Sequence, residues 1–246
     1  MNWPQVPLGY CVSEVRHKNR GGQEHNLLSL SYGNIVRRDI TSNEGLLPES
    51  FDTYNVVDSG DTVLRLTDLQ NDQRSLRVGL VQERGIITSA YVSIRPGNQV
   101  DSRYLNYFLK HLDFRKEFYA LGAGVRQSLR FDELKGIRVP VPSMASQRAI
   151  ADYLDVESAR SEALIRLLNV TSQQSIRWYL AGSVPKISPV SVEDQRSASA
   201  ELRTSSDLIE TLSLRLQTQL ELVREHRQAQ VTAAVMGELD IPGVTL

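Results

Sequence analysis

The chain has 246 residues, of which 41% are hydrophobic, and its 28 basic and 29 acidic residues give a formal net charge of -1. This balance excludes a uniformly basic protein that coats nucleic acid through bulk charge, although it allows a local basic patch. The single cysteine, Cys11, excludes an intramolecular disulfide, and the four histidines lack zinc-binding spacing. No hydrophobic run reaches the roughly 18 residues that a membrane helix requires, and the first residues lack signal-peptide features. We therefore expect a cytoplasmic protein with no metal site and no membrane segment.

Residues 1–143 are predicted to form a mixed α/β domain in which strands predominate. Hydrophobic and β-branched runs predict strands at 27–32, 54–57, 62–66 and 86–94. The sequence Asp58-Ser59-Gly60-Asp61 predicts a tight turn between the second and third of these strands. Asp101 can cap a helix in which apolar residues recur every three or four positions, at Tyr104, Leu105, Phe108, Leu109 and Leu112.

The chain changes character at Pro140-Val141-Pro142, and residues 144–246 have the composition and periodicity of helices. We predict a helix at about 145–168, a connector at about 169–190 and a second helix at about 191–236, from the breaks at Gly182, Pro185 and Pro189. Apolar residues near seven-residue spacing predict a helix-pairing seam at Leu202, Ile209, Leu212, Leu216, Leu220 and Val223. This seam packs either against the first helix or against a second chain. The predicted fold class is α+β, with a mixed α/β domain followed by long helices that form a coiled-coil spacer.

Enzyme motifs are absent from the sequence. It has no phosphate-binding loop, no GxGxxG and no Gly-x-Ser-x-Gly. Asp113, Glu133 and Lys135 weakly resemble a nuclease site, but a charged helix start or turn explains Glu133 and Lys135 more simply. We therefore expect a protein without catalytic residues, and a nuclease remains the weakest alternative.

Basic residues are concentrated in the loops of the first part. Residues 1–143 contain 18 basic and 16 acidic residues, whereas residues 144–246 contain 10 and 13. Arg and Gln side chains can read base edges through paired hydrogen bonds. The predicted DNA contacts are Lys18, Arg20, Arg37, Arg38, Arg74, Arg77, Arg126, Gln127 and Arg130. The alternative is that these residues only keep the domain soluble.

Two groups of these candidates allow more than one interpretation. Arg126 or Gln127 is expected to read a base edge, although the glycine-flanked loop around them can equally be a structural turn. Tyr32 and Tyr91 can touch DNA, but a tyrosine beside strand residues is more often a half-buried packing group, so packing is the expected role.

Several segments resemble the target-recognition domain of type I restriction-modification specificity subunits. They are the segments 26–35, 54–57 with Gly60-Asp61, 85–91, 124–129 and 137–142. Residues 147–155 resemble the start of that family's conserved spacer helix, and residues 227–240 resemble its end. The motifs occur in the family's order and cover most of residues 3–168 and 220–243. Only one recognition domain is present, so the chain resembles a half-size member of the family.

The resemblance implies a non-catalytic subunit that binds double-stranded DNA and directs partner subunits to a bipartite target. Those partners would be methyltransferase subunits that use S-adenosylmethionine and a translocating nuclease subunit that uses ATP and Mg²⁺, so no cofactor is expected in this chain. A half-size member implies a second copy of itself and an interrupted palindromic target, although pairing of the two helices within one chain would allow a monomer. The alternative function is a coiled-coil scaffold that does not bind DNA.

Overall fold

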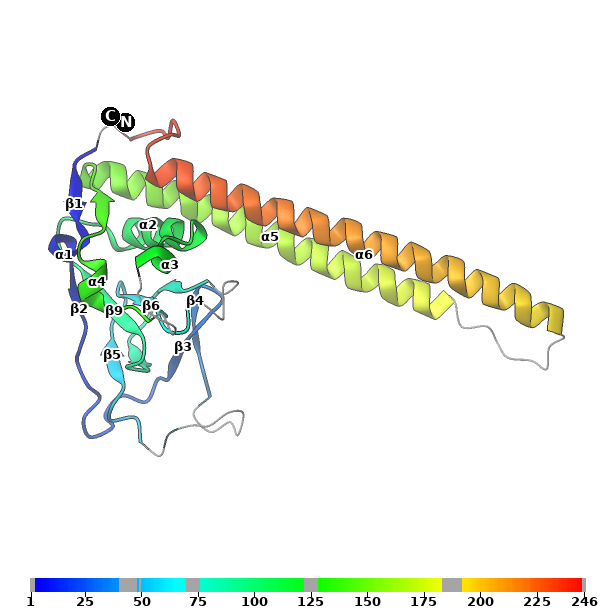
Figure 1. The fold of residues 1–246 in the computed structure, drawn as a ribbon, viewed down its shortest axis with the longest axis horizontal. Coiled ribbons are helices and arrows are strands. Elements are labelled where there is room, and N and C mark those ends of the chain that lie inside the picture. Colours follow the sequence, from blue (N-terminus) through cyan, green and yellow to red (C-terminus); the bar gives the residue numbers. More distant parts are fainter. Residues whose placement is uncertain are drawn as a thin grey trace. The chain divides into compact units, whose positions relative to one another are not determined.

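A computed structural model describes residues 3–39, 48, 50–69, 76–121, 128–182 and 192–244. It divides into unit 1, residues 1–154 with 230–246, and unit 2, residues 155–229. Unit 1 contains the strands and short helices, whereas unit 2 consists of the central parts of two long helices, α5 (Met144–Gly182) and α6 (Val192–Val235) (Figure 1). The predicted fold class, a mixed sheet domain followed by long helices, is confirmed.

The helical region differs in detail from the predicted one. Helix α5 continues to Gly182, past the predicted end near 168, because residues 169–181 contain neither proline nor glycine. Part of the predicted connector is therefore helical, and the remainder lies outside the described residues. Helix α6 differs from the predicted 191–236 by one residue at each end. The unit boundary falls after Leu154 and not at 143, since the start of α5 and the end of α6 are buried in the core of unit 1.

The described residues of unit 1 form four antiparallel sheets. The largest has the order β2 (Val12–Glu14), β9 (Val92–Pro96), β6 (Thr62–Leu64) and β7 (Val78–Leu80). The two-stranded sheets pair β1 (Gln5–Pro7) with β10 (Arg138–Pro140), β3 (Leu28–Ser31) with β4 (Asn34–Arg37), and β5 (Asn55–Val57) with β8 (Gly85–Ile87).

The predicted strand at 86–94 is in fact two strands in different sheets. Strand β8 pairs with β5, whereas β9 pairs with β2 and β6. A turn separates them, closed by the Tyr91 amide, which donates to the Thr88 carbonyl at 3.2 Å. The predicted turn at 58–61 is present, with the Asp61 amide donating to the Asp58 carbonyl at 3.1 Å and a φ of +93° at Gly60.

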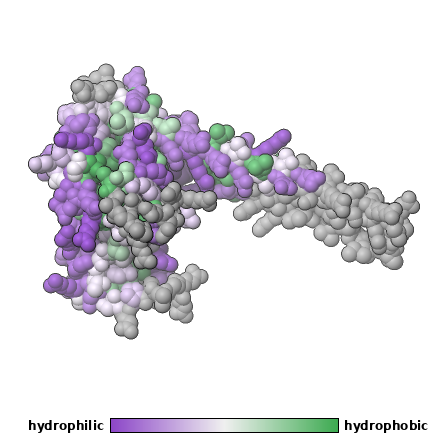
Figure 2. Space-filling view, in the orientation of Figure 1, coloured by the Kyte–Doolittle hydropathy of each residue, from purple (hydrophilic) through white to green (hydrophobic). Residues whose placement is uncertain are grey.

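The core of unit 1 forms where helix α2 (Ser102–Phe114) packs against the sheets. Asp101 caps this helix as predicted, because its carboxylate accepts from the amides of Arg103 and Tyr104 at 3.0 and 3.2 Å. All five predicted apolar positions of α2 are buried. Three short helices complete the unit: α1 (Leu8–Cys11), α3 (Glu117–Leu121) and α4 (Phe131–Leu134). Figure 2 shows that hydrophilic residues dominate the visible described surface of unit 1.

In unit 2, α5 and α6 run antiparallel and side by side (Figure 1), joined by Arg227 Nη2 and Glu162 Oε1 at 3.5 Å. Ser158 and Ser161 are buried on the inner face of α5. The described members of the predicted seam are half-buried, at Leu212, Leu216, Leu220 and Val223. The side chains of Leu202 and Ile209 lie outside the described residues. None of the described helices is both long enough and apolar enough to cross a membrane.

Candidate nucleic-acid interface

A tight loop between β2 and β3 holds Arg20 out into solvent. The buried Asn19 side chain donates from Nδ2 to the Glu24 carbonyl and accepts from the Glu24 amide through Oδ1, each at 3.0 Å. Gly21 and Gly22 have φ values of +76° and +61°, the left-handed conformation that glycine adopts without steric cost. Arg20 therefore lies on a loop fixed at its base, with its side chain exposed.

Lys18 lies in the same loop but is half-buried, and its Nζ donates to the Thr53 carbonyl at 3.0 Å. This hydrogen bond ties the loop to the residues that precede β5 and leaves the charge of Lys18 partly accessible.

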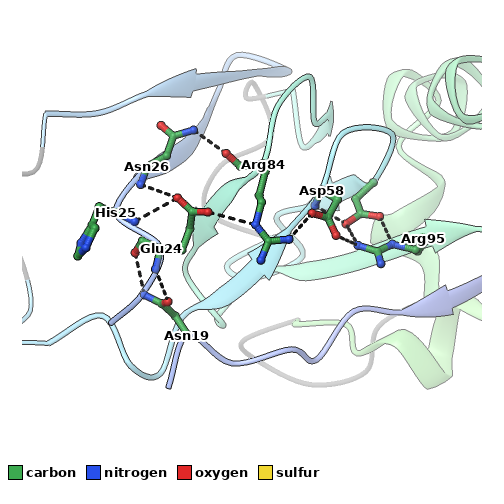
Figure 3. Close-up of polar contacts among 8 residues, drawn as sticks. Asn19, Glu24, His25, Asn26, Asp58, Arg84 and Arg95 are labelled. Carbon is green, nitrogen blue, oxygen red and sulfur yellow. Dashed lines mark hydrogen bonds and ion pairs between the residues drawn. The ribbon is translucent and has the colours of Figure 1, made fainter. Parts of the chain in front are cut away.

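A ladder of alternating charges stabilises the neighbouring turn at 58–61 (Figure 3). Arg84 Nε lies 3.2 Å from Glu24 Oε2, and its Nη1 lies 2.7 Å from Asp58 Oδ1. Arg95 then joins Asp58 and Asp61, each at 2.7 Å. The charges of Arg84 and Arg95 are engaged in ion pairs that hold three chain segments together, so these arginines stabilise the fold and are less available to a ligand.

The ion pairs of the ladder also shift the pKa values of Asp58 and Arg95. Burial raises the pKa of the Asp58 carboxyl, but the hydrogen bonds and charges of Arg84 and Arg95 outweigh burial and lower that pKa overall. The hydrogen bond and charge of Asp61, which is 1% exposed, raise the pKa of Arg95. Both groups therefore stay ionised near neutral pH.

Arg37 is the last residue of β4 and Arg38 follows it, and both are exposed. Arg37 forms a bidentate ion pair with Glu83, whose pKa is lowered chiefly by that hydrogen bond. The Arg38 amide donates to the Leu27 carbonyl at 2.8 Å, which fixes its backbone, while its side chain forms no ion pair within the described part of the chain. Of these two arginines, Arg38 has the more available charge.

Arg77 is fully buried, which corrects its prediction as a DNA contact. Its guanidinium donates to the carbonyls of residues 65, 67 and 68 at 2.9 to 3.2 Å and to the Tyr119 hydroxyl at 3.1 Å. Its amide donates to Asp113 Oδ2 at 2.6 Å. A side chain enclosed in this way cannot reach a phosphate, so Arg77 is a structural residue.

The three residues considered for a nuclease each have a structural partner. Burial raises the pKa of Asp113, opposed mainly by the hydrogen bond from the Arg77 amide. Glu133 accepts from the Arg130 amide at 2.7 Å at the start of α4, and Lys135 lies 2.6 Å from Asp132. No group of three potential metal-ligating side chains occurs among the described residues.

Arg130 is exposed at the start of α4, and its side chain forms no ion pair in the described ranges. The predicted contacts Arg74, Arg126 and Gln127 lie outside the described residues.

The structure brings some of the predicted contacts together. The bridge between Lys18 and Asn55 attaches the Arg20 loop to β5. The bridge between Leu27 and Ile86 attaches to β8 the residue that precedes β3, whose carbonyl accepts from the Arg38 amide.

Tyr32 differs from the expectation that it packs against the domain. It occupies the two-residue turn between β3 and β4 with Gly33, and the φ values are +46° and +78°. Its side chain is 80% exposed, whereas Tyr91 packs against a core cluster as expected. A left-handed conformation costs a residue with a Cβ about 1–2 kcal/mol. Sequence analysis placed Tyr32 beside a strand but could not show that it lies in a strained turn.

Comparison with known proteins gives one family match. Residues 80–169 match the family model described as "Type I restriction modification DNA specificity domain". No curated protein matches the chain.

Among solved structures, the chain is 18% identical to the S subunit of the type I restriction-modification system from M. genitalium, with a TM-score of 0.47. That alignment covers 74% of this chain and 46% of the other. The HsdS subunit from Thermoanaerobacter tengcongensis is 14% identical, with a TM-score of 0.37 and coverages of 96% and 45%. A chain from a study of type I R-M complex assembly and conformational transition is also 14% identical, with a TM-score of 0.45 and coverages of 96% and 46%. The chain thus spans slightly less than half the length of these proteins.

Proposed function

We propose that this chain, whose residues 80–169 match the family model of the type I restriction modification DNA specificity domain, is a sequence-specific DNA-binding subunit of a type I restriction-modification complex. The family match carries this proposal. The matched residues extend from the end of β7 through α2 and α4 into α5, so they include α2, the helix that packs in the core of unit 1.

The charge distribution of unit 1 supports DNA binding. Arg20, Arg38 and Arg130 are exposed and form no ion pair among the described residues, so each can neutralise a phosphate. Phosphate contacts position such a domain, and side chains at base edges give it sequence preference.

The subunit itself would be non-catalytic and would act in the cytoplasm, where its DNA substrate is found. Methyl transfer from S-adenosylmethionine would belong to methyltransferase subunits, and ATP- and Mg²⁺-dependent cleavage to a translocating nuclease subunit. The chain's own role would be to hold these partners at one DNA sequence.

Selection from randomised duplexes tests DNA binding directly. The full-length chain should enrich a sequence over successive rounds, and its affinity should fall steeply with salt, by about 0.9 in the log-log slope for each phosphate contact. The chain alone should not cleave the duplex with Mg²⁺. Failure to enrich any sequence would refute the proposed function and favour a scaffold.

The complex would contain two copies of this chain. One recognition domain covers a short half-site, and a two-fold protein presents identical readers in inverted orientation, so the target would be an interrupted palindrome.

The outer face of α5 supports a protein partner. Val156, Leu167 and Val170 are 50 to 61% exposed and lie on the face of α5 opposite Ser158 and Ser161, which pack toward α6. The described seam residues of α6 are half-buried in the helix pair, so the seam itself is covered, whereas exposed apolar side chains occur on α5 and, at Leu214 and Leu222, on α6. We assign the partner surface to α5.

Light scattering of the chain, alone and with its methyltransferase subunit, tests this stoichiometry. Leu167→Glu should weaken the assembly without unfolding unit 2, and Leu214→Glu on α6, which is 64% exposed where Leu167 is 61%, serves as the matched control. Methylation mapping in cells then gives the target. A complex with one copy, or a target with unrelated halves, would overturn the two-copy arrangement.

A further inference from the structure

The turn that joins β3 and β4 is a poor place for a tyrosine. The strands pair from Leu28↔Arg37 to Ser31↔Asn34, which leaves Tyr32 and Gly33 as a two-residue turn with both φ values positive. Such a turn favours Asn-Gly, because a bulky residue in the first position is strained. Strain of this kind persists where the surrounding structure fixes it, and it is found most often at functional sites.

Packing does not compensate this strain. The Tyr32 side chain is 80% exposed, and among the described residues it has no hydrogen bond or ring contact. An exposed aromatic ring in a strained turn lowers the stability of the free protein, so its benefit must come from a bound partner.

The β3–β4 hairpin, which carries Tyr32, packs closely against Leu76 and Gly79. A Cβ added to Gly33 would lie 3.0 Å from the Leu76 Cβ, and one added to Gly79 would lie 2.6 Å from a terminal carbon of Leu30. Leu28, at the base of the hairpin, and Leu30, close to its turn, are buried. The backbone therefore presents the tip, with exposed Ser31 and Asn34 beside Tyr32, in a fixed position.

We propose that the β3–β4 hairpin enters a groove of duplex DNA and that the ring of Tyr32 contacts the bases there. This inference rests on the proposed function. The major groove is wide enough for a two-stranded ribbon, and asparagine beside the ring can pair with adenine. In a duplex the base faces are stacked on one another, so an aromatic ring in the major groove meets base edges, where it can make apolar contact with the thymine methyl group. Tyr32 would therefore add affinity, and Asn34 would add sequence preference.

The test uses the duplex pool enriched by the wild-type full-length chain. Tyr32→Asn should raise the urea midpoint of unfolding, since it creates the preferred turn sequence, and should weaken binding to the pool about fivefold or more. Tyr32→Phe keeps the ring and should bind within about twofold of wild type. Tyr10→Ala is the control, because Tyr10 is 76% exposed on α1, and its removal should leave binding unchanged.

Opposite changes in stability and affinity would distinguish a DNA contact from a structural residue. If the wild-type chain enriches a sequence and Tyr32→Asn binds it equally well, the ring of Tyr32 does not contact DNA and the proposal is overturned. An equal loss in Tyr32→Phe and Tyr32→Asn would overturn the role of the ring. If the wild-type chain enriches nothing, the proposed function fails and this inference fails with it.

Discussion

Replacement of Arg77 by alanine should destabilise unit 1 severely, although its sequence context had suggested a DNA contact. The guanidinium is fully buried and makes at least four hydrogen bonds, three of them to backbone carbonyls at 2.9 to 3.2 Å. Each hydrogen bond to a charged group contributes about 1.5–3 kcal/mol, but these contributions are not additive, because water can enter the space and satisfy some of the carbonyls. We expect a loss of about 3–5 kcal/mol, the range observed when one partner of a buried ionic interaction is removed.

Urea unfolding followed by tryptophan fluorescence measures this loss. The chain has two tryptophans, and a Trp178→Phe background leaves only Trp3, which is buried in the core of unit 1. Arg77→Lys keeps the charge but not the planar fork of donors, so it should show an intermediate loss. Arg38→Ala is the matched exposed control and should change stability by no more than about 0.5 kcal/mol.

The reasoning would be refuted if Arg77→Ala cost less than about 1 kcal/mol. If the same variant also flattened the salt dependence of DNA binding, Arg77 would be accessible in solution, and its assignment as a DNA contact would be restored.

Other predictions concern pH, charge and packing. Burial lowers the pKa of His111 below its usual value of 6.5, so the unfolded chain binds a proton more readily than the folded chain. The stability of unit 1 should therefore fall as the pH drops below about 6.5. In urea unfolding, His111→Gln should lack this part of the pH dependence. Arg20→Ala and Arg38→Ala should each reduce the log-log salt slope of DNA binding by about 0.9, and an unchanged slope would remove that residue from the interface. Gly85→Ala should lower the free energy of unfolding by about 1–3 kcal/mol, because the added Cβ would lie 2.5 Å from a backbone carbonyl oxygen. Gly136→Ala, whose Cβ would have no atom within 4 Å, should not show this loss. Equal effects of the two substitutions would contradict the packing argument.

Local signals predicted the parts of the fold that depend on local chemistry. Asp101 caps α2 because an aspartate before an amphipathic run satisfies free amides, whatever lies around it. The turn at 58–61 likewise closes through its own residues, since the Asp61 amide donates to the Asp58 carbonyl and Gly60 adopts a positive φ, and the ion pairs of Arg84 and Arg95 add to it. The break between β8 and β9 was missed because it depends on which strands each segment pairs with, and residues 86–94 show no proline or glycine that would mark it.

The candidate interface was less predictable, because the role of an arginine depends on residues far away in the sequence. Arg77 lies in a stretch of polar residues and resembles a solvent-exposed loop arginine, yet its partner Tyr119 is 42 positions further along. Tyr32 is the converse case. Its neighbours predict packing, but the turn geometry, which depends on the register of β3 and β4, turns the ring outward.

Ion pairing decides which positive charges remain for DNA. Arg37, Arg84 and Arg95 are at least partly exposed, but each is paired with a carboxylate that must be displaced before it can bind a phosphate. Arg20 and Arg38 have no such competitor among the described residues, so their positive potential is uncompensated. The formal net charge of -1 therefore does not describe this surface, because the attraction for DNA depends on where the unpaired positive charges lie. Electrostatic steering depends on these unpaired charges and not on the total, which is how a nearly neutral chain can present a basic surface to the duplex.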